Sequence, residues 1–264
     1  MRPNHLKDMC QKQQAVVNGW LGIPSSYAAE VMGHQGFDAV TVDLQHGMIG
    51  FDQAVAMLQA LSATPALPLA RVSRNDPALV MQVLDAGAYG IICPMISSAL
   101  EAQSFVSACR YPPLGTRSFG PARAMLYGGP DYFQGANAVV LTLAMIETRA
   151  GLDALDAILA VEGLDGIFVG PNDLALALGK APSSEPDDAE VRQAIAHICE
   201  RTRAHGKIPG IFCSSGEAAA QRIAEGFLLV TPGHDVGLLS QAARRAVQVA
   251  RSQSPYGQGA SVGY

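Results

Sequence analysis

The sequence is poor in charged residues, lacks a strongly basic segment and has no closely spaced cysteine pair. Charged side chains make up 16% of the 264 residues, and the formal net charge is −5. Because nucleic-acid binding relies on a basic surface, this composition argues against a nucleic-acid partner. The five cysteines are odd in number and include no Cys-x-x-Cys motif, so a disulfide framework or a structural zinc site has little support. Functions that act on small molecules remain, and composition does not choose among them.

Long apolar runs are also missing. No stretch of about 20 apolar residues is present to cross a membrane, and residues 1–18 lack the apolar segment of a secretory signal. We therefore expect no membrane partner and a cytoplasmic location. Apolar residues nevertheless form 49% of the chain, enough for a large core. With so little charge, much of the surface must be covered in another way, and a homo-oligomer is the obvious candidate.

One pattern recurs eight times along the chain: a short apolar run, a turn and a helical segment. The apolar runs are nearly continuous rather than alternating, as in parallel strands that are covered on both faces. The predicted strands are Gly19–Ile23, Ala39–Leu44, Leu67–Val72, Gly90–Met95, Val139–Ile146, Gly166–Val169, Ile208–Cys213 and Phe227–Thr231. The predicted helices include Phe51–Ser62, Asp76–Ala86, Leu100–Cys109, Leu152–Val161, Ala189–Ala204, Gly216–Glu225 and a long final helix, Val236–Arg251.

This alternation predicts an α/β fold, a single (β/α)8 TIM barrel over residues 1–264. We interpret residues 1–18 as a helical lead-in and residues 252–264 as a flexible tail, and we expect the long final helix to serve in oligomerisation. Several joints carry a glycine that would end a helix just before a strand, namely Gly36, Gly87, Gly163 and Gly206. A doubly wound open sheet is the alternative architecture, although no GxGxxG fingerprint supports it.

Polar residues gather where the predicted strands end, which is where TIM barrels place their active sites. Glu147 follows the fifth strand and Asp173 the sixth, so their carboxylates should converge. Two such carboxylates repel each other unless a proton or a cation joins them, and a divalent ion such as Mg²⁺ or Mn²⁺ fits this site. The alternative is an ion pair between Glu147 and Arg149, with Asp173 as a helix N-cap. Position alone leaves both open.

Three more ionisable residues are candidates. His46 follows the second strand and is either a general base, a metal ligand or a loop histidine without a role. Arg71 ends the third strand, where a guanidinium is costly unless it meets an anion, and the alternative is a structural salt bridge. Asp85 belongs to a helix–strand joint, and its position favours a simple capping residue.

No lysine is placed to form a Schiff base at the barrel mouth. The only lysines are Lys7, Lys12, Lys180 and Lys207, and none stands at the carboxyl end of a predicted strand. A Schiff-base aldolase needs such a lysine. If this barrel performs carbonyl chemistry, a metal ion is the remaining electrophile.

The candidate residues belong to a series of short motifs that occur in a fixed order. These are Gly36-Phe37-Asp38, Asp43-x-x-His46, Arg71 with Asn75-Asp76-Pro77, Tyr111-Pro112-Pro113-x-Gly115-x-Arg117, Ile146-Glu147-Thr148 and Gly170-Pro171-x-Asp173-Leu174. With them the chain resembles the metal-dependent class II pyruvate aldolases of the HpcH/HpaI family, which include 4-hydroxy-2-oxoheptanedioate aldolase and 2-dehydro-3-deoxyglucarate aldolase. The resemblance spans essentially the whole barrel, from Gly19-Trp20-Leu21-Gly22 to the last helix.

The resemblance implies a reversible aldol reaction between a 2-oxo acid, pyruvate or hydroxypyruvate, and an aldehyde. Glu147 and Asp173 would bind a divalent ion (Mg²⁺, Mn²⁺ or Co²⁺), which the 2-oxo acid would chelate. The segment Gly170, Pro171, Asn172 and Asp173 would hold the substrate carboxylate through backbone N–H groups at the start of a helical turn.

The resemblance also assigns catalytic roles. His46, steered by Asp85, would act as a base through a metal-bound water and remove a methyl proton. Arg71 would bind the substrate and stabilise first the enolate oxygen and then the aldehyde oxygen. A homohexamer is implied as well.

Some positions depart from the family pattern. Gln45 replaces the frequent Glu before the histidine, and Met145 replaces the frequent Gln before Glu147, so donor preference is open. Trp20, Phe119 and Phe212 would line the aldehyde side, with ordinary core or interface aromatics as the alternative. Decarboxylation of oxaloacetate gives the same enolate and is the nearest rival activity, followed by an acyl-CoA lyase. A catalytically silent binding or assembly protein is a third class, which the intact set of candidate residues disfavours.

Overall fold

The computed structural model describes residues 1–252 and contains a closed barrel of eight parallel strands. Strand order follows the chain, and β8 pairs with β1 in parallel to close the sheet. The (β/α)8 prediction is therefore confirmed and the doubly wound alternative is wrong, because an open sheet does not pair its first and last strands in this way. The strands are β1 Val16–Leu21, β2 Ala39–Asp43, β3 Leu67–Arg71, β4 Gly90–Cys93, β5 Leu141–Ile146, β6 Gly166–Val169, β7 Ile208–Cys213 and β8 Leu229–Pro232.

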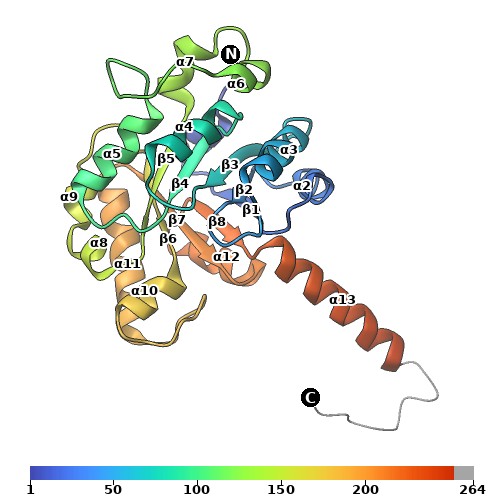
Figure 1. Ribbon diagram of the computed structural model, residues 1–264. Coiled ribbons are helices and arrows are strands. Elements are labelled where there is room, and N and C mark those ends of the chain that lie inside the picture. Colours follow the sequence, from blue (N-terminus) through green and yellow to red (C-terminus); the bar gives the residue numbers. More distant parts are fainter. Residues whose placement is uncertain (253–264) are drawn as a thin grey trace.

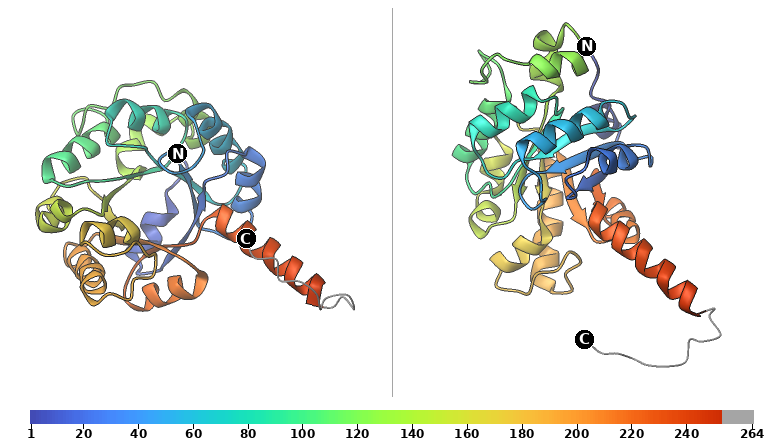
Figure 2. Two further views of the ribbon diagram at one scale, coloured as in Figure 1. Left: turned by 60° about the horizontal axis from the view of Figure 1, so that its bottom comes forward. Right: turned by 45° about the vertical axis from the view of Figure 1, so that its right-hand side comes forward.

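Helices form a ring around the barrel, and the last helix projects away from it (Figures 1 and 2). Among residues 1–252, no helix is long and apolar enough to cross a membrane. The helices are α1 His5–Gln11, α2 Ser26–Gly33, α3 Phe51–Leu61, α4 Pro77–Asp85, α5 Ala99–Cys109, α6 Ala122–Gly128, α7 Tyr132–Val139, α8 Arg149–Asp153, α9 Leu155–Leu159, α10 Pro171–Ala177, α11 Ala189–Ala204, α12 Gly216–Ala224 and α13 Asp235–Ser252.

Local sequence explains most of these boundaries. The first turns of seven helices are capped by a side chain that accepts a backbone N–H, as polar N-cap residues typically do. These N-cap residues are Asn4, Ser25, Asp76, Ser98, Thr148, Asp188 and Ser215. At the other helix ends, the four predicted glycine joints are confirmed by positive φ angles, for example 103° at Gly87. Glycine adopts this backbone conformation without steric cost.

The structure differs from the sequence prediction at the start of β1 and in the helical segment after β5. β1 begins at Val16, three residues before the predicted strand, so the helical part of the expected 1–18 lead-in is only α1. The predicted helix over 152–161 is split into α8 and α9 at Ala154. Apart from Ser252, which ends α13, the predicted tail at 252–264 lies outside the described residues.

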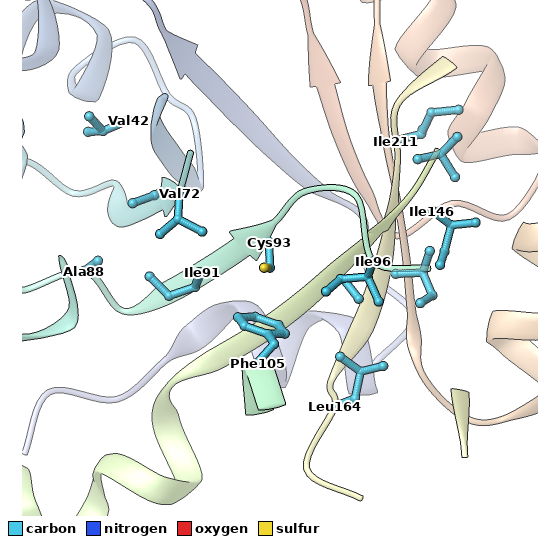
Figure 3. Close-up of a cluster of buried hydrophobic side chains, with 14 of the residues drawn as sticks. Val42, Val72, Ala88, Ile91, Cys93, Ile96, Phe105, Ile146, Leu164 and Ile211 are labelled. Atoms are coloured by element: carbon cyan, nitrogen blue, oxygen red, sulfur yellow. The ribbon is translucent and has the colours of Figure 1, made fainter. Parts of the chain in front are cut away.

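The strand residues alternate between two apolar layers. In β5, Ala144 and Ile146 belong to the layer between barrel and helices, whereas Leu141, Leu143 and Met145 belong to the cluster inside the barrel. Figure 3 shows part of the outer layer, where Ile91 and Cys93 of β4 lie near Phe105 of α5. Helix α1 contributes Leu6 and Cys10 to the inner cluster and closes the amino-terminal end of the barrel. The carboxyl end is left open for a site.

The same alternation places polar groups inside the barrel. Asn18 donates to Thr231 Oγ1 at 2.9 Å and accepts from Thr41 Oγ1 at 3.0 Å, and all three side chains are fully buried. Asp43 and Arg71 stand two residues beyond interior positions of β2 and β3, so they also point inward at the open end. Because side chains alternate between the two faces of a strand, only those strand-end residues that point inward can reach a common cavity.

Candidate active site

A cavity of about 420 Å³ opens at the carboxyl ends of the strands. Nine of the residues predicted for the site line it: Trp20, His46, Arg71, Glu147, Gly170, Pro171, Asn172, Asp173 and Phe212. Residues outside the prediction that also line it include Asp43, Met48, Met145, Phe168, His234 and Val236. Two residues that the sequence predicted for the site, Asp85 and Phe119, do not line the cavity.

Glu147 is the most buried carboxylate in this cavity, with 2% of its surface exposed. Its Oε1 accepts the backbone N–H of Met95 at 2.8 Å, and Met95 has the uncommon φ of 59° for a residue other than glycine. A Cβ on Gly170 would collide with the other oxygen of Glu147, so glycine is needed there. Burial, reinforced by the nearby charge of Asp173, raises the pKa of Glu147 to about 7.

The alternative roles for Glu147 and Asp173 do not occur. Arg149 pairs with Glu190 at 3.5 Å instead of Glu147. The N-cap of α10 is Gly170, and Asp173 is the third residue of the helix. Both carboxylates therefore face the cavity without an ion-pair partner among residues 1–252.

This pair suits a divalent ion that prefers oxygen ligands. No group of three or more His, Cys, Asp or Glu side chains within residues 1–252 is arranged to hold a metal. The protein therefore offers two carboxylates, one of them raised in pKa by burial beside the other. Mg²⁺ and Mn²⁺ accept few protein carboxylates and leave the remaining positions to water and substrate. The residues present fit such an ion.

Arg71 is held in a buried ion pair with Asp43. Arg71 Nε donates to Asp43 Oδ1 at 2.8 Å and Nη2 donates to Oδ2 at 2.5 Å, while the indole of Trp20 donates to Oδ2 at 3.1 Å. Burial by itself would raise the pKa of Asp43, but the hydrogen bonds and charge of Arg71 outweigh it and hold that pKa below its usual range. The salt-bridge alternative is thus present in the structure, and it leaves Arg71 on the cavity wall.

The same aspartate orients the loop that carries His46. Asp43 Oδ1 accepts the backbone N–H groups of Gln45 at 3.0 Å and of His46 at 3.3 Å. His46 is exposed at the cavity and close in sequence to the end of β2. One carboxylate therefore fixes both the guanidinium and the histidine loop, a role that the sequence prediction did not give to Asp43.

Asp85 and Phe119 lie at the opposite end of the barrel. Asp85 is the last residue of α4, which runs from the carboxyl end of β3 back toward the amino end of β4. It accepts from Arg117 Nη2 at 2.7 Å. Phe119 is 66% exposed and its ring contacts Tyr111 and Phe133. Within one chain, therefore, neither residue reaches His46 or the cavity.

Aromatic rings form one wall of the cavity. The ring of Trp20 stacks on Phe168 with centroids 5.6 Å apart and meets the edge of Phe212 at 5.8 Å. Phe212 in turn meets the ring of His234 at 6.3 Å. The sequence prediction missed Phe168 and His234, although both stand at strand ends.

No lysine lines the cavity, in agreement with the sequence. Lys7 pairs with Asp165 at 2.9 Å, and Lys207 precedes β7 at the far end of the barrel. Lys180 follows α10 and pairs with Asp188 at 3.2 Å.

Known proteins share both this sequence and this fold. A family model described as HpcH/HpaI aldolase/citrate lyase matches residues 18–242. A hydroxypyruvate/pyruvate aldolase of Rhizorhabdus wittichii is 46% identical over 94% of this chain and 99% of its own. A 4-hydroxy-2-oxo-heptane-1,7-dioate aldolase of Salmonella dublin is 39% identical over 91% and 92%. A crystal structure of an HpcH/HpaI aldolase/citrate lyase family protein from Burkholderia cenocepacia superposes with a TM-score of 0.88, at 33% identity, covering 94% of this chain and 99% of that one.

Proposed function

The chain belongs to the HpcH/HpaI aldolase/citrate lyase family, and from that premise we propose that it is a class II aldolase. It catalyses the reversible addition of a 2-oxo acid, pyruvate or hydroxypyruvate, to an aldehyde. One observation carries the proposal: Glu147, which is buried and has no ion-pair partner among residues 1–252, shares a lysine-free cavity with Asp173 and Arg71. A carbonyl reaction there needs an electrophile other than a Schiff base.

That electrophile is a divalent ion, Mg²⁺, Mn²⁺ or Co²⁺, held by Glu147 and Asp173. When bound, it polarises the keto group of the 2-oxo acid and makes the adjacent methyl protons more acidic. The backbone N–H groups of Asn172 and Asp173 lie in the first turn of α10, where N–H groups lack helical acceptors. They are suited to hold the substrate carboxylate, with Gly170 and Pro171 shaping the approach.

Arg71 and His46 have separate catalytic roles, charge stabilisation and proton transfer. Because Asp43 engages Nε and Nη2 of Arg71, the Nη1 group is left to donate to a substrate oxygen as negative charge develops there. In addition, His46 removes the proton from the methyl group and delivers it to the aldehyde oxygen as the carbon–carbon bond forms. In cleavage, it takes the proton from that hydroxyl and returns it to the enolate carbon. Histidine suits this task because it exchanges protons near neutral pH.

The placement of Asp85 and Phe119 limits what they can do. If Asp85 steers His46 and Phe119 contacts the aldehyde, a second copy of the chain must supply them, because both lie at the far end of the barrel. We therefore propose a homo-oligomer, a homohexamer by resemblance, in which the site is completed across an interface.

The test is to measure exchange of pyruvate methyl protons into deuterated water, together with aldol cleavage and metal affinity. His46→Ala should slow exchange by roughly 10²- to 10⁴-fold, the usual contribution of a positioned base. Arg71→Ala should slow both reactions, and Arg71→Lys should restore only part of the rate because it lacks the planar fork. Metal affinity should survive all three changes. Exchange at the wild-type rate in His46→Ala would contradict the mechanism at its first step.

A second experiment tests whether a metal ion is the electrophile. Activity should disappear with excess chelator and return with added divalent ion, whereas borohydride with pyruvate should not trap the protein covalently. Activity that persists in chelator would exclude the metal.

Decarboxylation of oxaloacetate would use the same residues, because loss of CO₂ yields the same enolate, and we expect it as a side activity. An acyl-CoA lyase is less compatible with the cavity. Its lining holds one guanidinium and no lysine, and that guanidinium already pairs with Asp43.

A further inference from the structure

The loop between α10 and α11, residues 179–188, has no part in the reaction proposed above, although its middle reaches the mouth of the barrel. Asn172 Nδ2 donates to Ser184 Oγ at 3.1 Å. Asn172 lines the cavity, and its backbone N–H is one of the two groups assigned to the substrate carboxylate. Ser184 is half-buried and does not line the cavity. The serine therefore acts on the site only through the side chain of Asn172.

Ser184 is held in place by its neighbours in the loop. Glu185 Oε1 accepts the backbone N–H of Ser214 at 2.9 Å, just beyond β7, and Glu185 Oε2 lies 3.6 Å from Nη2 of Arg222. On the other side of Ser184, Ser183 Oγ accepts the backbone N–H of Glu185 at 3.2 Å, which tightens the turn. A hydroxyl on a loop anchored in this way has a fixed position, so it can fix the side chain that it binds.

The two backbone N–H groups beside this hydrogen bond are unoccupied within the described chain. Asn172 and Asp173 are the second and third residues of α10, and neither N–H has an acceptor among residues 1–252. An asparagine side chain readily accepts a nearby backbone N–H, including its own. A freely rotating Asn172 amide would therefore compete with the substrate carboxylate for these two groups. In the structure the amide is instead bonded to Ser184.

We propose that Ser184 is a positioning residue that sets the affinity of the site for the 2-oxo acid. Its hydroxyl holds the Asn172 amide, so that the N–H groups of Asn172 and Asp173 stay free for the substrate carboxylate. This role rests on the proposed aldolase function and deepens it. Because the carboxylate takes no part in bond making, the bond affects the bound substrate and the transition state equally. Its loss should therefore change KM and leave kcat as it is.

The experiment measures KM and kcat for pyruvate with the metal-loaded protein and a saturating aldehyde, together with the Kd of pyruvate by calorimetry. Ser184→Ala should raise KM and Kd roughly 3- to 10-fold, the size of one hydrogen bond, and leave kcat unchanged. Ser184→Thr keeps the hydroxyl group and should keep the wild-type values. Ser183→Ala removes the neighbouring hydroxyl, which bonds to Glu185 and not to Asn172, and is the matched control with the wild-type KM.

A double variant distinguishes this role from a purely structural one. Ser184→Ala combined with Asn172→Ala also removes the released amide, so it should recover most of the affinity that Ser184→Ala loses. If the serine only kept the loop folded, the second substitution would recover nothing. A double variant that binds pyruvate as weakly as Ser184→Ala would overturn the role of Ser184. A wild-type KM in Ser184→Ala, or an equal rise of KM in Ser183→Ala, would also overturn it.

Exchange of pyruvate methyl protons separates this proposal from the function on which it rests. At saturating pyruvate, Ser184→Ala should exchange protons at the wild-type rate, because the base and the metal ligands are unchanged. A slower exchange at saturation, with an unchanged KM, would overturn the role of Ser184 and leave the aldolase assignment standing. A wild-type protein that neither exchanges protons nor forms an adduct would remove the proposed function itself.

Discussion

At the scale of single residues, Asp43 is the group on which the site depends most. It accepts from both nitrogens of the Arg71 fork, from the Trp20 indole and from two backbone N–H groups of the His46 loop. Its side chain is 5% exposed and that of Arg71 is 10% exposed. A buried ion pair of this kind is destabilised strongly when one partner is removed, because the other charge stays desolvated.

We expect Asp43→Asn to lower the free energy of unfolding by about 3–5 kcal/mol. It should also slow pyruvate proton exchange, because neither Arg71 nor the His46 loop is held in place. Denaturant unfolding and deuterium exchange measure the two effects. Asp156→Asn removes the carboxylate of an exposed pair with Arg201 and is the matched control, expected to leave both quantities nearly unchanged. Equal stability of the two variants would show that the Asp43–Arg71 pair does not hold the site.

Glu147 gives metal binding a predictable pH dependence. Its pKa is raised from the ordinary 4.5 to about 7, so below that pH the carboxyl is mostly protonated and a metal ion must displace the proton. Above that pKa the carboxyl group is already ionised and binds the metal ion without losing a proton. Affinity should therefore fall about tenfold for each pH unit below the pKa and level off above it, with proton release on binding. Calorimetric titration with Mg²⁺ or Mn²⁺ in buffers of different ionisation enthalpy measures both. Affinity that stays constant between about pH 5.5 and 8 would contradict this account of Glu147.

How far the sequence predicts single site residues depends on the strand pleat. Trp20, Arg71, Glu147 and Phe212 stand at strand ends with side chains that carry chemistry or bulk, and the sequence identifies them. Asp43 and Phe168 were missed because their side-chain direction follows from the register of β2 and β6, which the sequence analysis did not assign. Residues two apart on a strand point to the same face of the sheet. Knowing the register of β2 and β6 would therefore have shown that Asp43 and Phe168 point into the barrel.

At the scale of elements, Asp235 joins α13 to the barrel. Its carboxylate accepts from Gly22 and Ile23, just beyond β1, and it is the buried residue of an otherwise exposed helix. Asp235→Ala removes these charge-assisted bonds and should lower the free energy of unfolding by about 2 kcal/mol. Hydrogen exchange at the amides of Gly22 and Ile23 should become faster.

A capping residue of another helix provides the control for this change. Ser215→Ala removes the N-cap of α12 and should cost about 1 kcal/mol, without changing exchange at Gly22 and Ile23. Unaltered exchange at these amides in Asp235→Ala would mean that β1 does not hold the helix through this carboxylate.

Most predicted elements follow closely from the sequence, with one instructive exception. β6, β7 and α11 begin and end as predicted, because glycines and polar caps mark their ends. The segment after β5 reads as one helix but forms α8 and α9, since Thr148 caps the first turn and the chain bends at Ala154.

The partnership of Asp85 with His46 came from the resemblance alone. The course of α4 separates the two within a chain, and sequence contains no signal for a contact between chains.

At the scale of the whole molecule, α13 is the part that the barrel leaves uncovered. It extends away from the body of the protein (Figures 1 and 2), and only its first residue is buried. One face carries an apolar stripe with helical spacing, formed by Val236, Leu239, Ala243, Val247 and Ala250. Leu239 is 62% exposed and Val247 49% exposed. An isolated helix of this length is marginal in water, so its stability requires a packing partner.

We expect that partner to be a second copy of the chain, in keeping with the low charge of the sequence and with the proposal that Asp85 of a neighbouring copy completes the site. Leu239→Asp combined with Val247→Asp places two carboxylates on the stripe and should shift the protein toward a 27.6 kDa monomer in sedimentation velocity at micromolar concentration. The control, Gln241→Asp with Gln248→Asp, adds the same charge to the polar face and should leave the assembly intact. If Asp85 completes the site of a neighbour, the monomer should lose aldol activity while Glu147 and Asp173 still bind metal. A stable wild-type monomer, or a monomeric variant with full activity, would show that each barrel holds a complete site and that Asp85 has no part in it.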